Sequence, residues 1–152
     1  MERIVELLYR GLIACGTYAQ PVILLAIRLI WGWLFYVSGT DKLDDIDPVI
    51  TYFKELGIPY PVFNAYFVSL LEFIGGSCLL VGFASRLCGL ALTLSMGVAI
   101  ATAHHASLKV FFVNPADLIH QDPFTFFFAA LLIFAFGPGL LSVDALIKRR
   151  YS

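Results

Sequence analysis

The sequence predicts an all-α integral membrane protein built as a bundle of four transmembrane helices. Three observations predict this class: 60% of the residues are hydrophobic, only 14% are charged, and the apolar residues gather in four long stretches. Soluble domains are about 45–50% apolar and about 25% charged. The mean hydropathy of +0.86 points the same way. This composition argues against a soluble enzyme, a disordered chain or a nucleic-acid-binding protein.

The charge balance strengthens the last exclusion. The chain carries 10 Lys and Arg against 11 Asp and Glu, a net charge of -1, so no basic field is available to hold nucleic-acid phosphates. With 152 residues and no repeat or long linker, the chain is expected to form one domain over residues 1–152.

The four predicted spans are Tyr18–Gly39, Val62–Phe83, Leu87–Ala106 and Pro123–Leu141. A helix needs about 20 residues to cross about 30 Å of hydrocarbon, and the first three stretches fit this length. The fourth is weaker, because the Gly137-Pro138-Gly139 sequence is expected to break it. The turn between the second and third spans is very short, which predicts antiparallel neighbours.

A short amphipathic helix is predicted between the first two spans, over residues 47–57. One face of this segment is apolar, as in helices that lie on a membrane interface, and consists of Val49, Ile50, Phe53 and Leu56. Positive charges then set the orientation, because they favour the cytoplasmic side. One side carries six of them and the other carries three, which predicts both termini in the cytoplasm. The six are Arg3, Arg10, Arg86, Lys148, Arg149 and Arg150, and the three are Lys42, Lys54 and Lys109.

Two charged residues, Arg28 and Glu72, lie well inside apolar spans. A charge at bilayer depth costs at least about 2.5–3.5 kcal/mol, so each is expected to face a partner or a wet cavity. Arg28 is about 20 Å from Asp41 and Glu72 is about 16 Å from Pro61 at 1.5 Å per residue, which places them at similar depths. We therefore predict a buried Arg28–Glu72 pair. It is either a brace that fixes helix register or the centre of a proton or quinone site.

Small residues follow one face of each of the first three spans and include Gly32, Gly75 and Gly76. Such residues let helix backbones approach closely in lipid, so these glycines are expected to pack helices together. Trp31 and Trp33 lie deeper than a typical aromatic belt. They fit either core packing or a site for a flat ligand ring.

A polar mouth is expected at the outer ends of the spans, formed by Asp41, Lys42, His104 and His105. Adjacent histidines on a helix point about 100° apart, so His104 and His105 are poorly placed to bind one metal, and no metal site is predicted. The three cysteines, Cys15, Cys78 and Cys88, include no C-x-x-C motif and are interpreted as packing residues.

Several of these residues also form a motif pattern. It contains Arg28-Leu-Ile-Trp-Gly-Trp, Ser38-Gly39-Thr40-Asp41-Lys42-Leu43, Leu71-Glu72-Phe73-Ile74-Gly75-Gly76, Arg86 and Gly137-Pro138-Gly139. In this pattern, which extends over about 120 residues, the sequence resembles the DoxX family of small bacterial inner-membrane proteins. The resemblance implies a four-helix, multi-pass protein of the bacterial inner membrane. It also implies a role in a membrane redox or oxidative-stress complex, because the family takes its name from a subunit of a thiosulfate:quinone oxidoreductase.

The leading functional hypothesis is a subunit or partner of a quinone-linked membrane oxidoreductase or oxidative-stress complex. Quinone would bind among Trp31, Trp33 and the glycine faces, and a partner protein would supply the electrons. The alternative is a non-catalytic scaffold or assembly protein that binds another membrane protein, with Arg28–Glu72 as an internal brace. A small transporter is a third class. The sequence leaves open whether the chain catalyses a reaction, which cofactor it uses and whether it self-associates.

Overall fold

The computed structural model describes residues 2–103, 105–109 and 112–151, which form helices joined by turns and loops and contain no strand. The elements are α1 (Glu2–Asp44), α2 (Ile46–Glu55), α3 (Pro61–Val81), α4 (Ser85–Ala103), α5 (His105–Lys109), α6 (Pro115–Ile119), α7 (Asp122–Phe136) and α8 (Val143–Tyr151). Among these residues, α1, α3 and α4 are long and apolar enough to cross a membrane. The all-α prediction is confirmed. Helix α7 has only 15 residues, so a fourth crossing stays a prediction.

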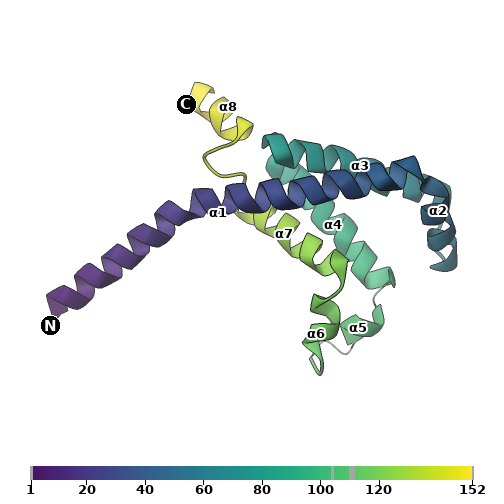
Figure 1. Ribbon diagram of the computed structural model, residues 1–152, viewed down its shortest axis with the longest axis horizontal. Coiled ribbons are helices and arrows are strands. Elements are labelled where there is room, and N and C mark those ends of the chain that lie inside the picture. The colour runs from purple at the N-terminus through teal and green to yellow at the C-terminus, as the bar shows by residue number, and fades with distance from the viewer. Residues whose placement is uncertain (1, 104, 110–111, 152) are drawn as a thin grey trace.

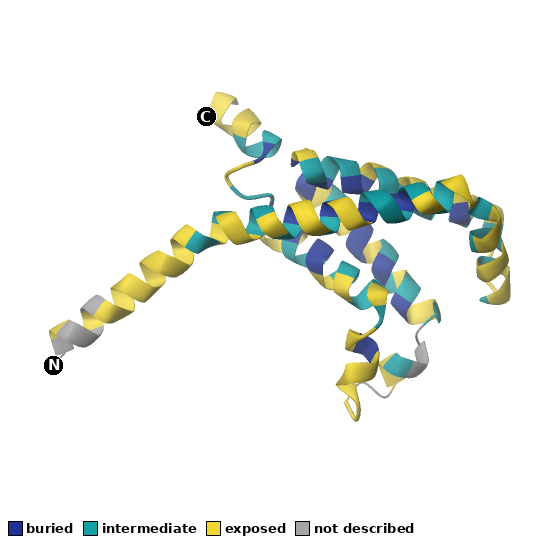
Figure 2. Ribbon diagram, in the orientation of Figure 1, coloured by how far each residue is buried: buried dark blue, intermediate teal, exposed yellow. Residues whose placement is uncertain are grey.

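Helix α1 is much longer than the sequence predicted. It does not begin at Tyr18 but runs from Glu2 to Asp44 through Pro21. Residues 2–20, which we call the α1 arm, extend away from the other helices (Figure 1), and residues 8–18 are all exposed (Figure 2). The predicted span was too short because the α1 arm mixes charged and apolar residues. By composition, only the part of α1 that follows the arm resembles a membrane helix.

Helices α1 and α3 run antiparallel and pack through glycines. A Cβ atom at position 76 would lie 2.8 Å from the Gly32 carbonyl oxygen and 2.9 Å from the Tyr36 Cα. A Cβ atom at position 39 would lie 2.7 Å from the Phe73 Cα. The neighbouring atoms belong to the backbone and cannot rotate away, so these contacts exist only because the side chains are absent. They fix the register of the two helices.

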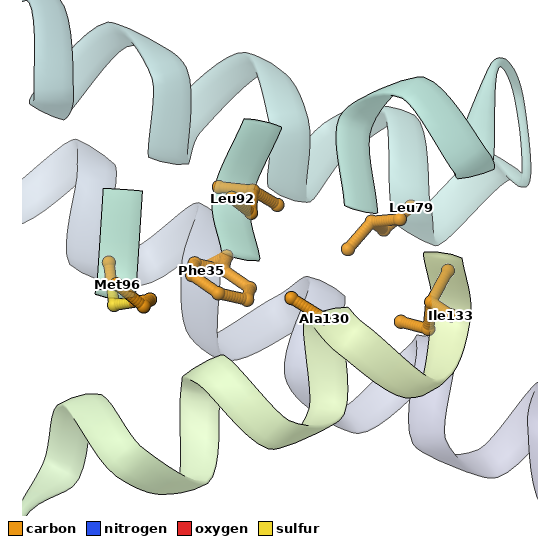
Figure 3. Close-up of a cluster of buried hydrophobic side chains, with 6 residues drawn as sticks. All are labelled: Phe35, Leu79, Leu92, Met96, Ala130 and Ile133. Carbon is orange, nitrogen blue, oxygen red and sulfur yellow. The ribbon is translucent and has the colours of Figure 1, made fainter. Parts of the chain in front are cut away.

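The apolar core is contributed by α1, α3, α4 and α7. Figure 3 shows its central cluster, which consists of Phe35, Leu79, Leu92, Met96, Ala130 and Ile133. A Cβ atom at Gly89 of α4 would lie 3.1 Å from the Ala130 carbonyl oxygen, so α4 and α7 also approach closely. The core therefore joins two tight helix pairs, α1–α3 and α4–α7, and the short α3–α4 connection links them.

The two ends of this core differ. The end that carries α2, which we call the α2 end, lies opposite the end that carries the α3–α4 connection, which we call the turn end (Figure 1). Helix α2 lies where the amphipathic helix was predicted, although it begins at Ile46 and ends at Glu55. The α1 arm and α8 both extend from the turn end (Figure 1), so the two described chain ends lie on the same side of the core.

Arg28 and Asp144 hold the turn end together. Arg28 is 3% exposed, and its guanidinium donates to the carbonyl oxygens of Pro138 at 2.9 Å and Leu141 at 2.7 Å. The Asp144 carboxylate accepts the backbone amides of Ala84 at 2.8 Å and Ser85 at 2.9 Å. These amides begin α4 and would otherwise lack partners. The segment after α7 is thereby tied to α1 and α4.

We predict that Gly76→Ala destabilises the fold by about 1–3 kcal/mol, because the added methyl group meets α1 backbone atoms. The free energy of unfolding in mixed micelles measures the effect. Gly16→Ala is the matched control, since a Cβ atom at Gly16 meets nothing within 4 Å. Equal stability of the two variants would contradict the packing described for α1 and α3.

Arg28→Lys is expected to lower the free energy of unfolding by about 1–3 kcal/mol, the usual cost of losing a hydrogen bond to a charged group. Lysine keeps the charge but lacks the planar fork that reaches two carbonyl oxygens at once. Arg10→Lys serves as control, because Arg10 is exposed and bonds only Glu6 of its own helix. Limited proteolysis of the loop at residues 137–142 gives a second measurement. If this loop is as resistant to protease in Arg28→Lys as in the parent protein, Arg28 does not hold it in place.

Candidate functional site

Glu72 of α3 is the most deeply buried acid among the described residues, with 1% of its surface exposed. Its carboxylate accepts hydrogen bonds from the Lys42 ammonium at 2.5 and 2.6 Å and from the Ser38 hydroxyl at 2.8 Å. Ser38 and Lys42 are four residues apart on α1 and therefore share one helix face. The carboxylate thus has a counter-ion and three donated hydrogen bonds, as a charge buried away from water requires.

The predicted Arg28–Glu72 pair is wrong. The glycine contacts place Arg28 beside Gly82 at the turn end, because a Cβ atom at Gly82 would lie 2.6 Å from an Arg28 nitrogen. Glu72 comes ten residues before Gly82, which places it about 15 Å back along α3 from the turn end. The depth estimate failed because it set the ends of the two helices level. In the fold, Lys42 lies near the end of α1, whereas Glu72 lies in the middle of α3.

A cavity of about 430 Å³ lies at the α2 end, and Lys42 and Glu72 form part of its wall. The rest of the lining is mostly apolar and comes mainly from α2, α3 and α4, with Ile58 of the following loop and Pro123 of α7. It includes Val49, Phe53 and Leu56 of α2, Val68 of α3, and Met96 and Ala99 of α4. Ligand pockets commonly combine a hydrophobic lining with a few placed polar groups. This cavity has that combination, with an ion pair as its main polar feature.

Helix α2 forms one side of this cavity. Val49, Phe53 and Leu56 recur at helical spacing, so one apolar face of α2 lines the space although no residue of α2 is fully buried. The helix packs against α3 and touches α1, whereas α4 forms the opposite wall. The cavity therefore lies between an amphipathic helix and a helix long and apolar enough to cross a membrane.

At the predicted quinone position, helix packing fills the glycine faces, whereas Trp31 borders a cavity. Gly32 and Gly76 are occupied by the α1–α3 contact, and Gly75 meets the Leu92 side chain. Trp33 is 55% exposed and stacks on Tyr36 with ring centroids 5.6 Å apart. Trp31 lines a smaller cavity of about 290 Å³ that has an apolar wall. The larger space, and the only charged groups beside either cavity, lie at the α2 end.

The predicted outer mouth is only partly described. Lys42 joins the Glu72 pair, and Asp41 is exposed next to it. His104 lies outside the described residues, and His105 begins α5 with no side-chain description. Over residues 2–103, 105–109 and 112–151, no three His, Cys, Asp or Glu side chains gather as a metal site would require.

Sequence reasoning missed two relations. The Ser38-x-x-x-Lys42 spacing puts two donors on one face of α1, and this pattern could have indicated a partner for Glu72. Cys78 and Cys88 lie five residues before and after Phe83 in the short turn. In the fold, the contact of Gly75 with the Leu92 side chain places Cys78 and Cys88, one turn away on the same helix faces, as neighbours, although the sequence interpreted them separately as packing residues.

Residues 23–105 match the DoxX family, a range that includes Lys42, Glu72, α2 and the α4 wall of the cavity. A Bacillus subtilis (strain 168) protein named "Putative oxidoreductase CatD" is 33% identical over 93 residues, which cover 61% of this chain and 66% of CatD. Two Escherichia coli (strain K12) inner membrane proteins are each 28% identical. The match to YphA covers 83% of this chain and 91% of YphA, and the match to YqjF covers 87% and 97%. No solved structure matches. With more than half of its length matched by the family, this chain belongs to the DoxX family of membrane proteins.

Proposed function

We propose that this protein is a multi-pass protein of the bacterial inner membrane that binds a lipid-soluble quinone in the cavity at the α2 end. In this role it is the membrane subunit or partner of a quinone-linked oxidoreductase or oxidative-stress complex. One observation carries the proposal: a buried carboxylate–ammonium pair, Glu72–Lys42, in the wall of an otherwise apolar cavity. The names of the relatives, one an oxidoreductase and two inner membrane proteins, support it.

The chemistry of the cavity fits a quinone. A quinone presents a flat apolar ring, an apolar tail and two carbonyl oxygens that accept hydrogen bonds. Phe53 and Met96 offer apolar contact to the ring. The Lys42 ammonium has three N–H donors, and its two hydrogen bonds to Glu72 leave one donor for a ligand. Lys42 therefore bonds a quinone carbonyl, and Glu72 holds Lys42 in place.

Quinone reduction takes two electrons and two protons. In the proposed complex the electrons come from a partner oxidoreductase, and the Lys42–Glu72 pair lies where it can pass a proton to a bound quinone oxygen. Acids inside membrane spans commonly act in such proton transfers. The chain is thus proposed to bind and orient the quinone while the partner performs the electron transfer.

The proposed orientation places the turn end in the cytoplasm. The α1 arm and α8 extend from that end, and they carry Arg3, Arg10 and the Lys148-Arg149-Arg150 sequence. Positive charge favours the cytoplasmic side, and the basic tail suits anionic headgroups. The cavity then lies toward the outer leaflet.

The alternative is a scaffold that binds another membrane protein, and one observation favours it. The α1 arm exposes apolar side chains beyond the core, including Leu8, Leu12, Ile13 and Tyr18. In this alternative the Lys42–Glu72 pair is only an internal brace between α1 and α3. Bound molecules identified by mass spectrometry after mild detergent extraction separate the two functions, since the scaffold copurifies with a fixed polypeptide and no quinone.

Filling the cavity is expected to abolish quinone binding without unfolding the protein. Ala99→Phe places a ring in the cavity, so the affinity for a short-chain ubiquinone should fall at least tenfold, or about 1.4 kcal/mol. Ala101→Phe is the matched control, because Ala101 is exposed and does not line the cavity. Titration in lipid nanodiscs measures the affinity, and equal affinities of the two variants would overturn the cavity as the binding site.

The ion pair is tested by one single and one double variant. Glu72→Gln leaves the Lys42 ammonium without its counter-ion and should lower both quinone affinity and the free energy of unfolding, the latter by about 1–3 kcal/mol. Combining Glu72→Gln with Lys42→Met removes both charges and should recover stability, because no unpaired charge remains. Quinone affinity should stay low in the double variant. Recovery of binding together with stability would instead identify the pair as a brace.

A further inference from the structure

The α3–α4 connection holds two cysteines opposite each other. The amides of Gly82 and Phe83 both donate to the Cys78 carbonyl oxygen, at 2.8 and 2.9 Å, and the Cys88 amide donates to the Ala84 carbonyl oxygen at 3.0 Å. Gly82 and Ala84 have positive φ angles of 77° and 46°, which reverse the chain within three residues. The last turn of α3 and the first turn of α4 are therefore tied to one tight connection.

Antiparallel pairing continues beyond this connection. The Leu92 side chain lies 3.0–3.2 Å from where a Cβ atom of Gly75 would be, so α3 and α4 remain in contact a full turn past the cysteines. Cys78 lies one turn along α3 from Gly75, and Cys88 lies one turn before Leu92 on α4, so the two cysteines lie on the faces that these helices turn toward each other. Both are free thiols and both are half-buried, whereas Cys15 is exposed on the α1 arm.

We propose that Cys78 and Cys88 form a redox-active dithiol that a lipid-soluble quinone oxidises to a disulfide. A disulfide needs sulfur atoms that approach closely in a specific direction, and two thiols that face each other from the ends of two adjoining helices need little backbone movement to form one. The position of the pair in two membrane-length helices determines the reagent. Charged reagents such as glutathione stay in water, whereas a quinone dissolves in the lipid beside the half-buried sulfurs.

The reaction balances without a further co-reactant. Two S–H bonds break and one S–S bond forms, while two electrons and two protons pass to the quinone oxygens and yield the quinol. Only the identity of the oxidant rests on the proposed function, because the juxtaposition of the thiols is independent of the cavity. If the quinone cavity and the dithiol both exist, the dithiol is a two-electron donor within this chain. Cys78 lies about 9 Å along α3 from Glu72.

The test uses the full chain in lipid nanodiscs, with Cys15→Ser to leave only the pair. The protein is reduced, freed of reductant and mixed with decylubiquinone, whose fully substituted ring does not add thiols. We expect quinol in a one-to-one ratio with protein, the loss of both maleimide-reactive thiols, and a protein mass lower by two hydrogen atoms. Cys15→Ser with Cys78→Ser and Cys15→Ser with Cys88→Ser are the matched controls and should yield no quinol and no intramolecular disulfide.

Two results would overturn the proposal. In one, both thiols stay reactive after quinone treatment of correctly folded protein, as checked by circular dichroism. In the other, the azo oxidant diamide forms the disulfide and quinone does not, which removes quinone as the oxidant. Ala99→Phe in the Cys15→Ser background separates this proposal from the cavity function. If this variant loses quinone affinity but its dithiol is still oxidised, the dithiol reacts independently of the cavity. If its quinone affinity is unchanged, the cavity is not the quinone site, and the dithiol proposal is unaffected.

Discussion

The close antiparallel contact between α1 and α3 is the constraint on which the other features depend. It exists because Gly32, Gly39 and Gly76 have no side chains where the two backbones meet. In lipid there is little hydrophobic gain from bringing two apolar helices together, so close packing and polar contacts must stabilise the association. The glycines allow that packing and in doing so choose a single register.

The register decides which buried charges meet. It sets Ser38 and Lys42 against Glu72 near the α2 end, and it sets Arg28 against the turn end, where Pro138 and Leu141 supply carbonyl oxygens. Each ionic group thereby meets a different kind of partner, Glu72 an opposite charge and Arg28 two backbone carbonyl oxygens. A shift of one helical turn would leave these groups unpaired in a medium that cannot solvate them.

The same arrangement separates two chemically different regions. Around Glu72, α2 and α4 leave an apolar space beside a charged pair, which suits a flat lipophilic ligand with hydrogen-bond acceptors. At the turn end, the structure is dense, with Asp144 capping α4 and two cysteines facing each other across the connection. The core between them is apolar and built from four helices, so the two regions are joined mainly through α3, which carries both Glu72 and Cys78.

The sequence by itself determined that this chain is helical, that it contains long apolar stretches suited to a membrane, and that an amphipathic segment follows the first of them, because these patterns can be read along the chain without its neighbours. The resemblance of its motifs also indicated the family. The tertiary structure alone decided the partner of Glu72, the role of Arg28, the place of the cavity and the meeting of Cys78 with Cys88. Hydrophobicity indicates which stretch of a helix suits a membrane but leaves that helix free to slide along its neighbour. Only the backbone contacts at the glycines remove that freedom, and they depend on both helices at once.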